Sequence, residues 1–541
     1  MSTYTAHIDS FARDALPPPE LQADCLFNLD ALQFPDRLNC ATELLDIKIE
    51  QGLSDKIAIK ADGASWSYQQ LLEKANQIAH VLEDDMGLKT GNRVLLRGPN
   101  NPMMAACWLA VIKAGGIVVA TMPLLKARDL EPIINKAEIE FALCDERLKD
   151  DLFEAQTLCP QLKTVYLFDR IADSQNGTEL EQKMQGKPTS YSNIDTAADD
   201  IALIAFTSGT TGQPKGTMHY HSDVMAMCVC VGGELVKPTS EDIFIGSPPL
   251  AFTFGLGMSL ALPLYAGATT ALVEMPTPDN LANAIYEFKA TICSTAPTGY
   301  RALMSAGKID LLGSLKKTVS AGEHLPLPTY QEWEKMTGIK MIDGLGATEM
   351  IHIFVSAEGD DIRPGAIGKA VPGYECCILD DEGKPVPAGE NGRLAVKGPT
   401  ACKYLADDRQ QNYVVNGWNF PGDICYMDAD GFVFYQARAD DMIISAGYNI
   451  SGPEVEVALL SHDVVQECAV VAAADIDRGT IVKAFVVLHE SPEDQAKLIK
   501  ELQDHVKQTI APYKYPRAIV FVDSLPKTQT GKIQRHKLRN E

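Results

Sequence analysis

TSGTTGQPKG, residues 207–216, directly follows IALIAF, residues 201–206, an apolar run that predicts a buried strand. Where that strand ends, the chain presents four hydroxyl side chains, three glycines and one lysine within ten residues. Hydroxyls and glycine N–H groups on such a loop can surround phosphate oxygens, and the Lys215 ammonium adds positive charge. The stretch therefore predicts a polyanionic ligand, bound at the point where a strand leaves the core.

The obvious comparison is the P-loop, G-x-x-x-x-G-K-[ST], and the spacing argues against it. Counted from Gly209, the residue before Lys215 is Pro214 rather than glycine, and Gly216 follows the lysine. Proline has no N–H and a fixed φ, so this loop does not supply the N–H donors of a P-loop. A polar surface turn is the simpler alternative, but the hydroxyls exceed what a turn requires.

The composition is that of a globular enzyme and narrows the class of partner. The 541 residues are 46% hydrophobic and 22% charged, and their formal net charge is −24. Such a charge repels phosphate polymers, which argues against nucleic acid and anionic membranes as general partners. A phosphate-bearing ligand would therefore need a local binding site. We expect a cytoplasmic protein, because residues 1–20 contain no apolar signal core and the thirteen sparse cysteines suit reduced, buried thiols.

The order of elements predicts an α/β fold. Short apolar runs such as RVLLRG and GIVVAT alternate with amphipathic stretches such as YQQLLEKANQIAHVLEDDM, which favours sheets joined by crossover helices. The most membrane-like stretch, residues 107–125, contains a lysine, two glycines and a proline, so we interpret it as a buried helix, a turn and a strand. The last hundred residues read as a separate α+β unit, with a boundary at residues 438–441.

Five further stretches carry a resemblance to a known family. They are SAGEHLP (320–326), DGLGATE (343–349), GWNFPGDICYMDADGF (417–432), ARADDMI (437–443) and PKTQTGKIQR (526–535). Together with residues 207–216 they resemble, in order, the motifs of the adenylate-forming enzymes: acyl-CoA synthetases, luciferases and peptide-synthetase adenylation domains. The resemblance implies a large N-terminal domain of stacked mixed or parallel sheets, residues 1–437, a hinge at 438–441, and a small mobile α+β domain, residues 442–541.

The resemblance also implies roles for individual residues. The nucleotide-binding set comprises Thr207, Ser208, Gly209, Thr210, Thr211, Lys215, Ala321, Gly322, Glu323, Asp343, Gly344, Asp423 and Arg438. The catalytic set comprises Lys532, Thr348 and Glu349, with Glu349 as the Mg²⁺ ligand, Asp440 as the hinge and Gly447 at the CoA channel. The chain departs from the family pattern at Pro421, where a hydroxyl residue is usual, so the local geometry of Asp423 is in question.

The chemistry explains why such residues are needed. A carboxylate is a poor electrophile, and the family activates it by attack on the α-phosphorus of ATP, with loss of pyrophosphate. Negative charge gathers around that phosphorus, and Mg²⁺, Lys215 and Lys532 would stabilise it. The CoA thiol then displaces AMP, after the small domain turns about Asp440 and withdraws Lys532.

The acid pocket is expected between residues 247–257 and 347–354. Its predicted residues are Phe252, Thr253, Phe254, His352 and Ile353. Taken singly, each suits an ordinary core position; together they suit a flat aromatic acid and resemble benzoate-type aryl-CoA ligases. Residues 7–20, HIDSFARDALPPPE, look more specifically like 2-aminobenzoate-CoA ligases, so we expect that acid first and benzoate second.

Other functions remain open at this point. The same fold can load an aryl acid onto a separate carrier protein, catalyse a luciferase-like oxygenation, or serve as a nucleotide-binding protein without catalysis. The intact Lys532, Glu349 and phosphate loop favour catalysis. The expected partners are an aromatic acid, ATP and CoA, and the protein is expected to be a monomer or a homodimer.

Overall fold

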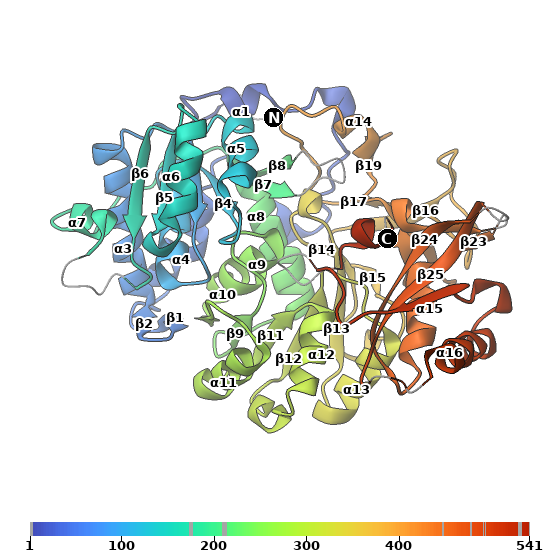
Figure 1. The fold of residues 1–541 in the computed structure, drawn as a ribbon. Helices are drawn as coiled ribbons and strands as arrows, with labels where there is room; N and C mark the ends of the chain where they lie inside the picture. The colour runs from blue at the N-terminus through green and yellow to red at the C-terminus, as the bar shows by residue number, and fades with distance from the viewer. Residues whose placement is uncertain are drawn as a thin grey trace.

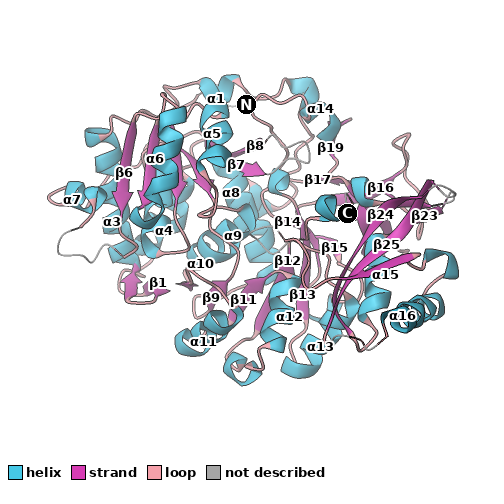
Figure 2. Cartoon of the chain, viewed as in Figure 1, coloured by secondary structure: helices cyan, strands magenta, loops and turns pink. Residues whose placement is uncertain are grey.

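The computed structural model describes residues 4–171, 177–207, 214–445, 448–475, 479–490, 492, 494–527 and 533–539. Two large sheets occupy the N-terminal and central parts of the chain (Figure 1). A smaller antiparallel sheet lies beside them, and a three-stranded sheet carries the C-terminal part. Helices and strands alternate along most of the chain, as Figure 2 shows.

The first large sheet has the strand order β6-β5-β3-β4-β7-β8. All neighbouring strands are parallel except β7 and β8, which are antiparallel. Parallel neighbours need crossover connections, and helices supply them here. The strands are β3 (Arg93–Arg97), β4 (Ile117–Thr121), β5 (Phe141–Asp145), β6 (Thr164–Phe168), β7 (Ile201–Thr207) and β8 (Lys215–Tyr220).

The second large sheet has the order β15-β14-β13-β12-β11-β9-β10-β1-β2. The strands from β13 to β1 are parallel neighbours, and the sheet ends in antiparallel pairs on both sides. The strands are β1 (Ile57–Ala61), β2 (Ala64–Ser67), β9 (Ile243–Gly246), β10 (Thr269–Leu272), β11 (Ile292–Thr295), β12 (Lys317–Ala321), β13 (Met341–Gly346), β14 (Ile353–Ser356) and β15 (Lys369–Ala370).

A buried helix pair lies in the main core. The helix α4 (Pro102–Lys113) is apolar on all sides and every one of its residues is buried. It packs against α3 (Tyr68–His80), whose first turn is closed by a capping box between Ser67 and Gln70. The main hydrophobic cluster includes residues of both helices and of both large sheets.

The remaining α-helices cover the sheets and the loops between them. They are α1 (Phe11–Asp14), α2 (Ile47–Glu50), α5 (Ala127–Lys136), α6 (Lys149–Leu158), α7 (Glu179–Met184), α8 (His221–Met227), α9 (Thr253–Leu256), α10 (Leu262–Tyr265), α11 (Pro278–Phe288), α12 (Pro297–Ser305), α13 (Leu327–Thr337), α14 (Gln410–Tyr413), α15 (Gly452–Leu460), α16 (Gln495–Thr509) and α17 (Arg535–Leu538). Three π-helical segments matter below: η4 (Val81–Asp85), η6 (Cys228–Val236) and η7 (Gly257–Ala261).

The C-terminal part has its own small core. The antiparallel sheet before it has the path β18-β19-β17-β20-β21, with β16 paired to β17. A hydrophobic cluster then joins α15 and α16 to the sheet β24-β25-β26. These strands are β16 (Glu375–Leu379), β17 (Gly392–Lys397), β18 (Val414–Val415), β19 (Trp418–Asn419), β20 (Asp423–Met427), β21 (Val433–Arg438), β22 (Ile443–Ser445), β23 (Tyr448–Ile450), β24 (Val465–Asp475), β25 (Gly479–Leu488) and β26 (Ala518–Phe521).

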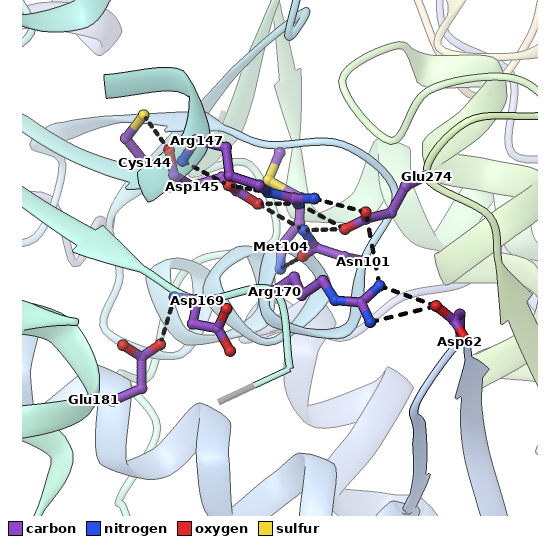
Figure 3. A network of polar contacts seen from close by, with 10 residues as sticks. All are labelled: Asp62, Asn101, Met104, Cys144, Asp145, Arg147, Asp169, Arg170, Glu181 and Glu274. Atoms are coloured by element: carbon purple, nitrogen blue, oxygen red, sulfur yellow. Dashed lines mark hydrogen bonds and ion pairs between the residues drawn. The ribbon is translucent and has the colours of Figure 1, made fainter. Parts of the chain in front are cut away.

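A polar network joins the ends of strands from the two large sheets (Figure 3). Arg147 donates to Asp145, the last residue of β5, and to Glu274, which follows β10. Asn101 caps α4 and donates to the same two carboxylates, at 3.0 and 3.2 Å. Because each carboxylate has hydrogen-bonding partners, we interpret the network as structural. It connects the two sheets at the place where the loops after their strands approach each other.

The predicted fold class is confirmed: a large α/β part of mixed sheets precedes a smaller α+β part. Residues 107–125 form most of α4, a glycine turn and β4, as expected. All thirteen cysteines are free thiols, and most are buried. Within the described residues, none of the helices is both long enough and apolar enough to cross a membrane.

Candidate active site

The two ends of the predicted phosphate loop lie opposite each other. Thr207 ends β7, Lys215 begins β8, and the two residues are paired in the antiparallel ladder. Ser208, Gly209, Thr210 and Thr211 lie outside the described residues. This pairing places Lys215 beside Thr207 at the end of β7. A loop that surrounds one ligand needs its two ends close together in this way.

A short turn beside this ladder carries Thr348 and Glu349. The 3-10 turn η9 (Thr348–Met350) follows the end of β13, and three side chains fix it. His219 of β8 bonds the Thr348 carbonyl at 2.8 Å, and Thr400 donates to the Met350 carbonyl at 2.9 Å. The Tyr404 hydroxyl donates to Oε1 of Glu349 at 2.5 Å. The turn is thus held at consecutive residues before any ligand binds.

Tyr404 also links the turn to the phosphate loop. The Lys215 ammonium donates to the Tyr404 hydroxyl at 3.4 Å and lies 5.2 Å from the centre of its ring. The structure thereby brings together Lys215, from the first sheet, and Glu349, from the second. A cation, a phenol and a carboxylate at one place suit a ligand that carries both phosphate and a metal ion.

A buried ion pair supports this corner from behind. Lys403 donates to Asp223 at 2.9 Å, and His219 lies 3.5 Å from the same carboxylate. Burial by itself would raise the pKa of Asp223, but the Lys403 charge and the nearby His219 ring hold the pKa below its usual value. Asp223 therefore stays ionised, and it orients the histidine that bonds the Thr348 carbonyl.

The predicted ribose residues face each other across a strand pair. Asp423 of β20 is paired with Arg438 of β21, and their side chains form an ion pair at 2.9 Å. Gly422 has φ 88°, and a Cβ there would lie 2.9 Å from the Arg438 guanidinium. The glycine thus provides the turn and the space that this ion pair needs beside Pro421. Asp423 is buried, whereas the Arg438 side chain is 47% exposed.

The predicted adenine-side residues lie together at the ends of two parallel strands. Ala321 of β12 is paired with Gly344 of β13. Gly322 has φ 91°, and the following Glu323 accepts a hydrogen bond from Thr298 at 2.7 Å. Asp343 faces a cavity that His324 and Tyr330 also line, and burial raises the pKa of its carboxyl to about 8.

Two of the predicted acid-side residues, Phe254 and His352, lie beside each other. His352 is 3% exposed, and its ring centre lies 5.5 Å from that of Phe254, at the start of the short helix α9. By distance and angle, neither ring nitrogen of His352 forms a hydrogen bond within the described residues, although the Phe254 backbone lies close enough to affect the ring. Burial lowers its pKa to about 4, so the ring is neutral at pH 7. An unpaired buried imidazole is free to bond a polar ligand.

The other predicted acid-side residues take different positions. Thr253 is buried, and with Phe252 it lines a small apolar cavity beside Trp108 of α4. Ile353 is also buried, but a Cβ added to Gly344 would meet its side chain at 2.5 Å. Ile353 therefore packs against the Gly344 backbone of β13, where it supports the nucleotide-side strand.

Two predicted residues, Lys532 and Gly447, lie outside the described residues. The chain before Lys532 is placed by an ion pair. Lys527 contacts Glu467 of β24 at 2.8 Å, and Arg301 of α12 lies 3.6 Å from the same carboxylate. The tail that carries the predicted catalytic lysine thus begins next to the helix that supports Glu323. Asp440 falls within the 3-10 turn η11 (Ala439–Asp441).

Sequence reasoning did not single out two residues that hold the site together. Tyr404 contacts Lys215 and Glu349, as described above. Asn100 binds the loop before Phe252: its amide donates to the Pro248 carbonyl at 3.0 Å and accepts from the Leu250 N–H at 2.8 Å. Two consecutive prolines at 248 and 249 were a usable signal, since a loop with few N–H groups depends on outside support.

Comparison with known proteins gives a consistent family. The AMP-binding enzyme family matches residues 48–405, and the AMP-binding enzyme C-terminal domain matches residues 454–532. Benzoate–CoA ligase from Thauera aromatica is 32% identical over 94% of this chain and 97% of its own length. An uncharacterised acyl–CoA ligase from Bacillus subtilis is 34% identical over 88% of this chain and 90% of its own length.

Solved structures agree with the sequence relatives. The crystal structure of an anthranilate CoA ligase in complex with anthranoyl-AMP has a TM-score of 0.89 and 33% identity, covering 95% of this chain and 98% of that one. A benzoate CoA ligase from Burkholderia xenovorans LB400 has a TM-score of 0.85 and 30% identity, covering 93% and 100%. With the strand-end cation, the Thr348–Glu349 turn and the Asp423–Arg438 pair in place, the chain belongs to the AMP-binding enzyme family and is an AMP-forming acid–CoA ligase.

Proposed function

We propose that the acid is aromatic, with 2-aminobenzoate preferred and benzoate second. The observation that carries this proposal is the buried, unpaired and neutral imidazole of His352 beside the Phe254 ring. A neutral imidazole offers one donor and one acceptor, and 2-aminobenzoate presents an acceptor carboxylate and a donor amine on adjacent ring carbons. Phe254 supplies a face on which a flat ring packs well.

The solved relative with anthranoyl-AMP supports the same choice, because anthranilate is 2-aminobenzoate. The benzoate–CoA ligase of Thauera aromatica, at nearly equal identity, supports the unsubstituted acid. The two acids differ by one amine, and a single hydrogen bond to it is worth about 0.5–1.5 kcal/mol, or roughly 2- to 12-fold in affinity. We therefore expect a preference rather than exclusive use of one acid.

For the nucleotide, we assign the roles that the family resemblance implies. Lys215 and the hydroxyls from Thr207 onward hold the departing pyrophosphate, Thr348 contacts the α-phosphate, and Lys532 aligns the carboxylate with it. Glu349 fits a Mg²⁺ ligand, because a carboxylate has about four lone-pair sites and Tyr404 takes one of them. Bound Mg²⁺ would neutralise charge on the phosphate oxygens.

Pyrophosphate–ATP exchange with a panel of acids tests the substrate. We expect 2-aminobenzoate and benzoate to support exchange better than 4-aminobenzoate or a six-carbon aliphatic acid, with AMP released on addition of CoA. Preference for the aliphatic acid would refute the aromatic assignment. Exchange without use of CoA would point instead to loading of a separate carrier protein.

A variant of Lys532 tests the two-step assignment. Lys532→Ala should lower pyrophosphate exchange by about 100-fold or more, since it removes a charge that stabilises the transition state. Thioester formation from supplied aryl adenylate should remain within a few fold of the parent. Equal loss in both half-reactions would contradict a role confined to adenylation.

A further inference from the structure

Tyr404 occupies a rigid, buried position between the two halves of the nucleotide site. Tyr404 is 1% exposed. The residues on both sides of it pair with the antiparallel strand β8 through two backbone hydrogen bonds. The Met218 N–H donates to the Lys403 carbonyl at 2.7 Å, and the Leu405 N–H donates to the Gly216 carbonyl at 2.8 Å. Its own N–H donates to the Gln410 side chain at 2.9 Å. The backbone and the ring of Tyr404 therefore have little freedom to follow a moving ligand.

The hydroxyl of Tyr404 has two charged partners of opposite sign. It donates to Oε1 of Glu349 at 2.5 Å and accepts from the Lys215 ammonium at 3.4 Å. Burial and the nearby Glu349 charge raise the pKa of the phenol far above its usual value, so the proton needed for donation is present at every working pH. The contacts form a chain from cation to phenol to carboxylate.

Loss of the Tyr404 hydroxyl would change how the Lys215 ammonium and the Glu349 carboxylate interact with each other. Without it, Oε1 of Glu349 loses a charge-assisted hydrogen bond in a buried corner, and the carboxylate is free to turn. Lys215 and Glu349 would then be free to attract each other directly. A direct ion pair would neutralise the two groups that must act on the triphosphate separately.

We propose that Tyr404 is a positioning residue for adenylate formation, whose hydroxyl keeps the Lys215 ammonium and the Glu349 carboxylate separate and aimed at the triphosphate. The inference rests on the roles proposed above for Lys215 and Glu349. The inference concerns adenylate formation only. Pyrophosphate has already left the site when CoA attacks the adenylate, so Tyr404 has no triphosphate to act on in the second half-reaction. The ring of Tyr404, which packs against Tyr413 at 5.8 Å between centres, is expected to matter for stability alone.

Tyr404→Phe removes the hydroxyl and retains the ring. We expect pyrophosphate exchange to fall by about 10- to 100-fold, the range for one hydrogen bond to a charged group. Calorimetric binding of Mg·ATP in the absence of acid should weaken, whereas thioester formation from supplied aryl adenylate should change by about twofold or less. Exchange and Mg·ATP binding at parental levels would overturn the inference.

Tyr68→Phe is the matched control. Tyr68, the first residue of α3, is fully buried and donates to the Ala268 carbonyl at 2.7 Å, far along the chain from Tyr404. The two variants should lose similar free energy of unfolding, but only Tyr404→Phe should lose exchange. An equal loss of exchange in both would mean that Tyr404 acts through stability, and would overturn the inference.

A double-mutant cycle with Glu349→Gln separates this inference from the proposed function. If Tyr404 acts through Glu349, adding Tyr404→Phe to Glu349→Gln should cost much less than it costs in the parent. Fully multiplicative losses would overturn the inference and leave the role of Glu349 intact. Parental exchange in Glu349→Gln alone would instead refute the role proposed for Glu349.

Discussion

Gly257 lets the ring of His352 lie directly against a helical backbone, and adding one methyl group there should displace it. Gly257 begins the π-helical segment η7 with φ −60°, a conformation that any residue adopts. A Cβ at this position would lie 2.4 Å from two atoms of the His352 ring and 3.0 Å from the Met227 sulfur. Gly257→Ala therefore tests packing without a backbone conflict.

The geometry gives the size of the effect. Carbon atoms in contact lie about 3.5–4.0 Å apart, so the His352 ring must move by roughly 1 Å. Overpacking of a buried site costs about 1–3 kcal/mol, and alanine in a helical position gains about 0.5–1 kcal/mol over glycine. The net loss of stability is therefore small, about 0–2.5 kcal/mol. A 1 Å misplacement at a binding site can lower the rate by about 100-fold.

Gly233→Ala is the matched control, because Gly233 lies in the π-helical segment η6 and an added Cβ meets nothing within 4 Å. Urea unfolding should show Gly233→Ala to be more stable than the parent by up to about 1 kcal/mol. Pyrophosphate exchange should show a 10- to 100-fold lower kcat/KM for the aromatic acid in Gly257→Ala. The ATP KM should be almost unchanged. If Gly257→Ala is stabilised like the control and retains its acid kinetics, His352 does not line the acid pocket.

Two further predictions concern the loop that Asn100 supports and the carboxyl of Asp343. Asn100→Ala removes the hydrogen bonds to Pro248 and Leu250. Urea unfolding should therefore show a free energy of unfolding lower by about 1–3 kcal/mol, and steady-state kinetics should show a higher KM for the acid alone. A rise in the ATP KM instead would contradict the assignment of Asn100 to the acid side. The pKa of Asp343 is about 8 in the folded state, whereas its ordinary value is 3.8. Between these two pH values the folded state binds a proton that the unfolded state has lost. The free energy of unfolding therefore falls as pH rises, by at most about 1.4 kcal/mol per pH unit. Asp343→Asn should remove that slope from unfolding curves at pH 5–8, and parallel curves for parent and variant would refute the assignment.

The local elements were predictable because their signals are local. Apolar runs give the β3, β4, β5 and β7 strands. The Ser-x-x-Glu spacing at residues 451–454 is a local helix-start signal, and the Ser451 side chain does cap α15 by accepting from the Glu454 N–H. The amphipathic stretch after Ser67 is helical as expected. It continues beyond α3 as the π-helical segment η4, a change of hydrogen-bond pattern that apolar spacing does not report.

The assembly of the site was only partly predictable. The motif residues come from the ends of strands, and the family resemblance places them together. The residue that connects them, Tyr404, is 55 residues from Glu349 and 189 from Lys215, and its role arises from the way the 401–405 segment lies along β8. No spacing rule covers such a contact, because it depends on tertiary packing.

On the roles proposed above, the segment from Thr348 to His352 would let one short piece of chain serve two substrates. Glu349 accepts from Tyr404, which also contacts Lys215, while His352 faces Phe254. Between them lies Ile351, which has φ 63° although β-branched residues rarely adopt positive φ. Such a conformation costs on the order of 1–3 kcal/mol and persists only where its surroundings impose it.

Those surroundings are present on both sides of Ile351. Thr400 holds the Met350 carbonyl, His219 holds the Thr348 carbonyl, and Ile351 itself is fully buried. A residue with ordinary φ at this position would continue the direction of the η9 turn and carry His352 away from Phe254. The positive φ of Ile351 lies within the reversal that joins the antiparallel strands β13 and β14, with the Glu349 carboxylate before it and the His352 imidazole after it. On the roles proposed above, this turn would bring the carboxylate of the acid and the α-phosphate of ATP together from opposite sides.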